Sequence, residues 1–169
     1  MGLEMEHYKE TLFNAFMWLQ SIENLLRDCI KLNCSIDHSR EIKQLEPIPD
    51  ERRMKNIHDR WGLGGLAWEA HNYSHGIDQQ LTHKLIKLGN YRNKLGHNSF
   101  NGYMQHIILN NFGGDDSRQR RIHREIKSYE LMAQVCGAYM GPLLRLHTKL
   151  SEEHSELALK PLDENFSCS

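Results

Sequence analysis

The sequence predicts an all-α protein, an antiparallel bundle of four to five helices. Apolar residues recur at steps of three and four over long stretches, no stretch alternates apolar and polar residues as a half-buried strand does, and the connections are short. The chain has 169 residues, 39% hydrophobic and 25% charged, which is typical of one globular domain. We therefore expect a single helical domain over residues 1–160 and a flexible tail over residues 161–169.

The N-terminal part of the chain predicts one long amphipathic helix from about Leu3 to Asn33. Its apolar face consists of Leu12, Phe16, Leu19, Ile22, Leu26, Cys29 and Ile30. The pattern breaks at Glu46–Asp50, "EPIPD", because two prolines with one residue between them cannot continue a helix. Short helical pieces are expected on both sides of this break. The stretch Gly62–Leu66, "GLGGL", has three glycines and no following lysine, so we expect a turn and not a phosphate-binding loop.

Two further helices complete the predicted bundle. One runs from about Ile77 through the stretch Tyr91–Phe100, "YRNKLGHNSF". An irregular, Asn- and Gly-rich stretch, Asn98–Asp116, follows it and could fold over it. From Ser117 the helical period resumes, with Ile122, Ile126, Tyr129, Met132, Cys136, Tyr139, Leu143, Leu146 and Leu150 on one face.

Charge and cysteine content narrow the function classes. The formal net charge is −1, so any binding to a polyanion has to come from a local patch. The first ten residues, "MGLEMEHYKE", lack the pattern of a signal peptide, and no stretch has the length of a membrane span. The four cysteines form no C-x-x-C pair. These features predict a cytoplasmic protein with reduced thiols and no membrane contact.

Arg92 is an anomaly in the predicted helix. Leu81, Leu85, Leu88, Arg92 and Leu95 follow one another at steps of 4, 3, 4 and 3, so the arginine stands where a helical bundle favours a leucine. Gly89 and Gly96 lie beside this seam, and Asn93 and His97 lie further round the helix. Two glycines in a helix indicate a close approach by another helix, by a second copy of the chain or by a ligand. Alternatively, Gly96 ends the helix and His97 follows on a loop.

The spacing from Arg92 to His97 has little weight by itself. With 11 His and a similar number of Arg, about one pair at this spacing is expected by chance, and three occur. Only the pair in "RNKLGH" has an asparagine directly after the arginine and interrupts a leucine seam. From the residues alone, a partly buried arginine paired with an acid elsewhere in the bundle is the more common explanation.

The six residues "RNKLGH" in a small all-helical chain resemble the signature of the HEPN superfamily: an arginine, commonly a polar residue after it, and a histidine four to six residues beyond. The resemblance implies an HEPN-like bundle that dimerises so that two copies of the motif face each other across a cleft. It implies RNA cleavage without a metal ion, or a binding module. It also implies a role in phage defence or in toxin and antitoxin pairs, where the partner is often a small nucleotidyltransferase.

Arginine and histidine suit that chemistry. An RNA 2′-hydroxyl that acts as nucleophile needs a proton acceptor near neutral pH and a fixed cation on the phosphate. His97 is then the acid or base, Arg92 the phosphate clamp, and Asn93 an orienting group. We therefore predict a metal-independent, cofactor-free endoribonuclease that acts as a homodimer. The alternative is a catalytically silent HEPN module that binds a nucleotide or a protein partner and uses Arg92 structurally.

Three other features are weaker candidates. His71 and His75 are four apart and could share a metal ion on one helical face, but no third ligand stands at a recognised offset, so no metal site is predicted. A basic cluster at the start of the last helix could contact RNA or be a solvated face, and it comprises Arg118, Arg120, Arg121 and Arg124. The three tryptophans, Trp18, Trp61 and Trp68, are expected in the core.

Overall fold

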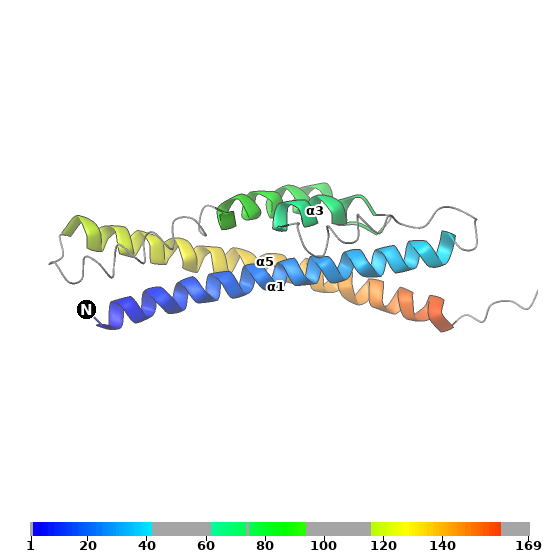
Figure 1. The fold of residues 1–169 in the computed structure, drawn as a ribbon, viewed down its shortest axis with the longest axis horizontal. Helices are drawn as coiled ribbons and strands as arrows, with labels where there is room; N and C mark the ends of the chain where they lie inside the picture. The colour runs from blue at the N-terminus through cyan, green and yellow to red at the C-terminus, as the bar shows by residue number, and fades with distance from the viewer. Residues whose placement is uncertain (1, 42–61, 74, 94–115, 160–169) are drawn as a thin grey trace, which may run out of the picture.

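The computed structural model describes residues 2–41, 62–73, 75–93 and 116–159 of the chain. These residues form two long helices, α1 (Gly2–Glu41) and α5 (Asp116–Leu159), and the short helix α3 (Leu63–His71). A further helix spans residues 79–93. Figure 1 shows the two long helices crossing at a shallow angle, with α3 and the 79–93 helix packed over their middle. No strand occurs among the described residues, so the predicted all-α bundle is confirmed.

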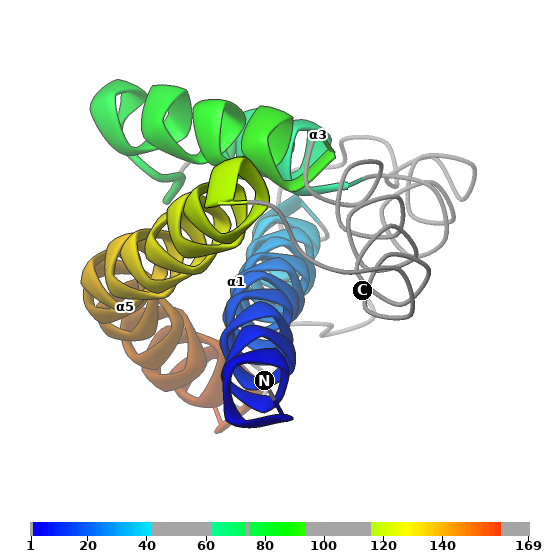
Figure 2. The same ribbon diagram turned by 90° about the vertical axis from the view of Figure 1, so that its left-hand side faces the viewer.

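The two long helices run in the same direction. Near their N-terminal ends, the hydroxyl groups of Tyr8 and Tyr129 lie 3.2 Å apart, and Tyr8 also donates a hydrogen bond of 3.1 Å to Glu125 Oε2. Toward their C-terminal ends, Ile36 of α1 and Leu150 of α5 share a small buried cluster. Figure 2 views this pair along its length. The first and last helices are therefore parallel to each other.

The short helix α3 and the 79–93 helix form an antiparallel pair. At one end of the pair, Ile77 N donates to Ala70 O at 3.2 Å. At the other end, a Cβ built on Gly89 would lie 2.9 Å from the backbone nitrogen of Gly64. The prediction of a turn over Gly62–Leu66 was therefore wrong. Only Gly62 precedes the helix, and the next glycines lie in its first turn, which the 79–93 helix can approach because Gly89 has no side chain.

The helix α1 continues to Glu41, beyond its predicted end at Asn33. The Asn33 side chain stays within the helix because its amide donates to Cys29 O at 3.2 Å. The next turn then buries Ile36 completely, and this burial offsets the cost of extending the helix. The sequence pattern was interrupted by asparagine, serine and aspartate, which favour helix ends only where no tertiary contact competes.

Most of the predicted apolar faces form the core. Leu19, Ile22, Leu26 and Ile30 of α1 are buried, together with Tyr129, Cys136 and Leu143 of α5. Two of the three tryptophans were wrongly predicted to be core residues: Trp18 is 40% exposed and Trp68 is 57% exposed. Trp61 and the predicted tail over residues 161–169 lie outside the described residues.

Candidate functional site

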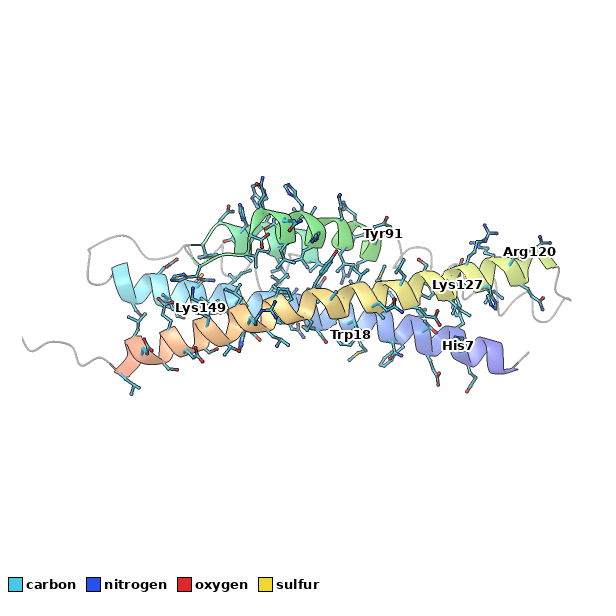
Figure 3. All side chains as sticks on the ribbon, turned by 180° about the vertical axis from the view of Figure 1, so that it is seen from behind. His7, Trp18, Tyr91, Arg120, Lys127 and Lys149 are labelled. Carbon is cyan, nitrogen blue, oxygen red and sulfur yellow. The ribbon has the colours of Figure 1, made fainter. Side chains whose placement is uncertain are left out.

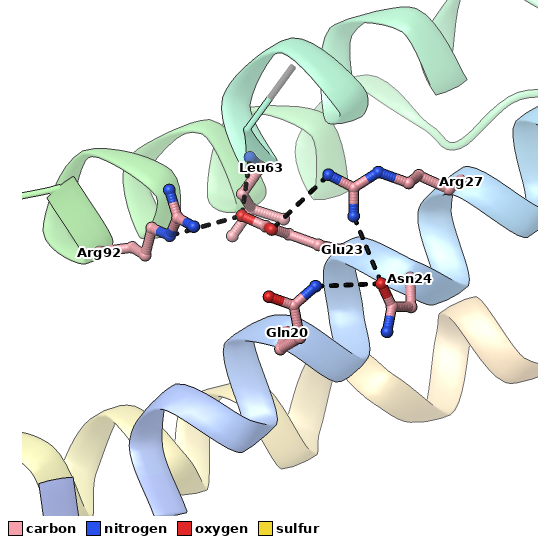
Figure 4. Close-up of polar contacts among 6 residues, drawn as sticks. All are labelled: Gln20, Glu23, Asn24, Arg27, Leu63 and Arg92. Carbon is pink, nitrogen blue, oxygen red and sulfur yellow. Dashed lines mark hydrogen bonds and ion pairs between the residues drawn. The ribbon is translucent and has the colours of Figure 1, made fainter. Parts of the chain in front are cut away.

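The carboxylate of Glu23 is the centre of a polar cluster beside the 79–93 helix, shown in Figure 4. Glu23 belongs to α1 and is only 2% exposed. Its Oε1 atom accepts a hydrogen bond from Leu63 N at 3.2 Å and lies 3.6 Å from Arg92 Nε. Its Oε2 atom lies 3.8 Å from a terminal nitrogen of Arg27. One buried carboxylate thus joins α1, α3 and the 79–93 helix.

Each contact of Glu23 has a physical reason. Gly62 precedes α3 and has no side chain to cap it, so Glu23 supplies an acceptor for the first backbone N–H of that helix. Arg27 stands one turn after Glu23 on α1, the spacing at which helical side chains meet. A buried carboxylate requires such partners, because removing it from water without them costs several kcal/mol.

The three charged side chains have a net charge of +1, because two guanidinium groups face one carboxylate. The Arg92 side chain is 38% exposed, whereas that of Arg27 is 18% exposed. Arg27 also donates to Asn24 Oδ1 at 3.4 Å, and Asn24 accepts a second hydrogen bond from Gln20 at 3.0 Å. An anion that approaches from solvent therefore meets Arg92 first, held from behind by Glu23.

Arg92 is thus the predicted site residue that the structure describes most fully. It lies near Gly62, where a built Cβ would be 3.7 Å from one of its terminal nitrogens. The side chain of Asn93 is exposed at the end of the described 79–93 range. His97 lies outside the described residues.

Gly89, one of the two glycines beside the leucine seam, has a clear role. Gly89 is buried against the backbone of α3, so another helix of the same chain makes the close approach that its sequence position predicted. The approach brings the N-terminus of α3 to the level of Arg92 and allows both to contact Glu23. Gly96 lies outside the described residues.

The basic cluster on α5 lies far from Arg92. Tyr8 contacts α5 at Tyr129 and Glu125, and Glu23 stands fifteen residues after Tyr8 on α1. At a rise of 1.5 Å per residue this separation is about 22 Å. Figure 3 shows Arg120 near one end of α5, away from Tyr91 on the 79–93 helix.

The individual arginines of that cluster have local contacts. Arg121 pairs with Glu125 at 3.2 Å, and Arg124 Nε donates to Arg120 O at 3.2 Å. The backbone of Arg118 belongs to α5. The structure therefore brings these arginines together with one another but not with Arg92.

His71 and His75 do not share a helical face, because α3 ends at His71. The Nδ1 atom of His71 lies 2.8 Å from Ile77 O, and Nε2 of His75 lies 3.2 Å from Glu153 Oε2 on α5. Among the described residues, no group of three or more metal-ligating side chains comes together.

Glu23 and Arg27 were missed in the sequence. Their signal is an acid that lies between Ile22 and Leu26, two residues of the apolar face of α1, with a base four positions after it. Such a pair is common on exposed helix surfaces. Only the packing of α3 and the 79–93 helix over Glu23 distinguishes the Glu23–Arg27 pair from an ordinary surface pair.

Comparison of the chain with family models, with curated proteins and with solved structures finds no match in any of the three. Within residues 2–41, 62–73, 75–93 and 116–159, no helix combines the length and the apolar character that crossing a bilayer requires.

Proposed function

We propose that the chain is a metal-independent endoribonuclease of HEPN type, which cleaves RNA at a composite site formed by two copies of the chain in the cytoplasm. The observation that carries the proposal is Arg92, which is exposed to solvent on one side and held by the buried Glu23 on the other. A fixed guanidinium can bind two oxygens of one phosphate and stabilise the charge that builds on them in the transition state. A toxin or phage-defence role is the setting that the HEPN resemblance implies.

In the proposed reaction, an RNA 2′-hydroxyl attacks the adjacent phosphorus and the 5′-oxygen of the next nucleotide leaves. His97 of one copy accepts the proton of the 2′-hydroxyl, and the second copy supplies the imidazole that protonates the leaving oxygen. Arg92 neutralises the non-bridging oxygens, and Asn93 orients an imidazole or a phosphate oxygen. The products are a 2′,3′-cyclic phosphate and a free 5′-hydroxyl.

The contacts of Glu23 support phosphate binding at this position. Its carboxylate is contacted by Arg27 and by Leu63 N as well as by Arg92, so it is fixed in place and can position the half-exposed guanidinium of Arg92 for a phosphate.

A second candidate function follows from the same ion pair. An arginine that links α1 to the 79–93 helix through a buried acid has a structural role of its own. The chain would then be a catalytically silent module that binds a nucleotide or a protein partner.

RNA cleavage by the purified protein in EDTA separates the two candidates. We expect His97→Ala to lower the rate by about a hundredfold or more, because general acid or base catalysis contributes at least that factor. Arg92→Lys should restore only part of the activity that Arg92→Ala removes, since an ammonium keeps the charge but not the planar pair of donors. RNA with 2′-deoxy substitution at the cleavage position should resist the enzyme.

His123→Ala is the matched control, because His123 also stands five residues after an arginine, Arg118, but on α5. It should cleave like the wild type. Circular dichroism must show equal helicity for all variants. Cleavage by His97→Ala at the wild-type rate, or no cleavage of any RNA by the wild-type protein, would exclude the enzyme and favour the silent module.

A further inference from the structure

The outer face of α5 has no partner among the described elements. Figure 3 views the molecule from this side, with α5 in front of α1. Lys127, Gln134, Gly141, Arg145 and Glu152 follow one another at steps of 7, 7, 4 and 7, so they share one strip of the helix. All of them are exposed apart from the half-buried Gly141.

The middle of this face has small residues, Gly137, Ala138 and Gly141. Gly137 and Gly141 stand one turn apart, although each glycine in a helix interior costs about 1 kcal/mol relative to alanine. A Cβ on Gly137 would meet nothing within 4 Å, and one on Gly141 would meet only the Arg145 side chain at 3.6 Å. Packing within the chain therefore does not explain Gly137, whereas Gly141 precedes Pro142 inside the helix, where a Cβ would crowd the proline ring.

Large apolar side chains border the same face. Leu131 is 60% exposed and Leu144 is 51% exposed, and at 100° per residue they project to opposite edges of the strip. Figure 2 shows no other described element on this side of α5. The middle of the face thus has small residues and its edges have large apolar side chains. This arrangement favours contact with another helix.

Charged side chains stand on both sides of the glycines. Lys127 precedes them and Glu152 follows them within the strip, with Arg124 and Glu156 further out. The exposed Arg145 and Lys149 also follow the glycines and the exposed Glu130 precedes them, so acids and bases occur on both sides.

A two-fold axis relates Lys127 to Glu152 as a pair of opposite charges. Lys127 and Glu152 have position 139.5 as their midpoint, and Gln134 and Arg145 have the same midpoint. The midpoint of Arg124 and Glu156 is position 140. These positions lie between Gly137 and Gly141. If two α5 helices pair antiparallel about that point, Lys127 faces Glu152 of the other copy, Arg124 lies near its Glu156, and Gln134 faces its Arg145.

We propose that the outer face of α5 is a self-association surface, which binds the α5 helix of a second copy antiparallel about Gly137–Gly141. Opposite charges across the contact set its register, and the glycines let the backbones approach. At a crossing angle of about 20°, helices diverge by only about 6 Å at the level of Lys127, which long side chains can bridge. This contact goes beyond the proposed function, because Arg92 lies on another part of the molecule.

Charge exchange tests the proposal with sedimentation equilibrium. Lys127→Glu and Glu152→Lys should each weaken the α5 contact at least about tenfold, because each places like charges opposite one another twice per dimer. The double variant Lys127→Glu/Glu152→Lys should restore association. Lys84→Glu and Glu10→Lys, exposed on other helices, serve as controls and should leave association unchanged.

Two further variants report on the geometry directly. Gly137→Leu should block the close approach while the isolated chain stays folded, since its new side chain enters open space. Gln134→Cys/Arg145→Cys, in a Cys168→Ser background, should form a disulfide-linked dimer, whereas Gln134→Cys/Lys149→Cys should not. Single charge variants that associate like the wild type, or a double variant that stays as weak as the single variants, would overturn the proposal whether or not the chain cleaves RNA.

Discussion

The Nε atom of Arg92 lies 3.6 Å from Oε1 of Glu23, a carboxylate that is buried in α1. This contact fixes one end of the 79–93 helix on α1 at the level where α3 begins. An arginine at a leucine position is therefore accommodated, because its partner is an acid at a second apolar position. Both the catalytic and the structural account of Arg92 depend on this pair.

Glu23→Gln removes the negative charge of this side chain and keeps a hydrogen-bond acceptor at the same place. The amide oxygen can still accept from Leu63 N, but Arg92 and Arg27 no longer face the negative charge of Glu23. We expect a loss of about 1 to 3 kcal/mol in the free energy of unfolding, measured by urea denaturation. If the proposed ribonuclease activity is present, kcat should fall more than KM changes, because Glu23 positions Arg92 without touching RNA.

Glu10→Gln is the matched control for that substitution. Glu10 is exposed on the same helix, so its replacement should change stability by less than about 0.5 kcal/mol. Equal stabilities for the two variants would contradict the anchoring role of Glu23.

The two facing glycines of the antiparallel pair should respond in opposite ways to alanine. Gly89→Ala should destabilise the protein by about 1 to 3 kcal/mol, because the new methyl group would lie 2.9 Å from the Gly64 backbone. Gly64→Ala places its methyl group in open space and should stabilise α3 by up to about 1 kcal/mol. Thermal unfolding measures both shifts, and a lower Tm for both variants would show that the pair packs differently.

Stability should decrease in alkaline solution through the buried thiols. Burial raises the pKa of Cys29 from 9.0 to about 12, with a contribution from the nearby Asp28, and burial raises that of Cys136 from 9.0 to about 11. Above pH 9 the unfolded chain releases these protons while the folded chain keeps them. The stabilisation is therefore complete below pH 9 and is lost as pH rises toward 11 and 12, with a slope of about 1.4 kcal/mol per pH unit for each thiol.

Urea denaturation between pH 8 and about pH 10 measures this slope, because burial also raises the pKa values of Tyr8, Tyr73 and Tyr129 above 10.0, and these groups add to the slope at higher pH. The Cys136→Ala variant should lose about half of it, whatever its stability at neutral pH. A slope unchanged by the substitution would show that Cys136 ionises equally in both states.

The hydrogen-bonded tyrosine pair should stabilise the parallel alignment of the long helices. The rings of Tyr8 and Tyr129 meet edge to face with centroids 5.7 Å apart, and their hydroxyl groups are 3.2 Å apart. Tyr8→Phe should cost about 0.5 to 1.5 kcal/mol, because the hydroxyl also donates to Glu125. In a double-mutant cycle with Tyr129→Phe, a coupling energy near zero would contradict the contact between the two hydroxyl groups. Tyr91→Phe is the control, because the Tyr91 side chain is 60% exposed.

The sequence by itself determined the helical fold and most of the core. Periods of three and four residues report which side of a helix is apolar, and this holds for α1 and α5 whatever they pack against. The same reasoning identified Arg92 as an exception within its seam. These are local properties of a helix, so they need no knowledge of the rest of the chain.

Only the tertiary structure decided which helices meet and what Arg92 contacts. By local propensity, "GLGGL" favours a turn. In the structure it belongs to α3, because packing against the helix that contains Gly89 outweighs the cost of about 1 kcal/mol for each glycine in a helix. Glu23 and Arg27 look like an ordinary surface pair until α3 and the 79–93 helix bury the acid. Contacts between residues distant in sequence depend on packing, and helical periodicity contains no information about that.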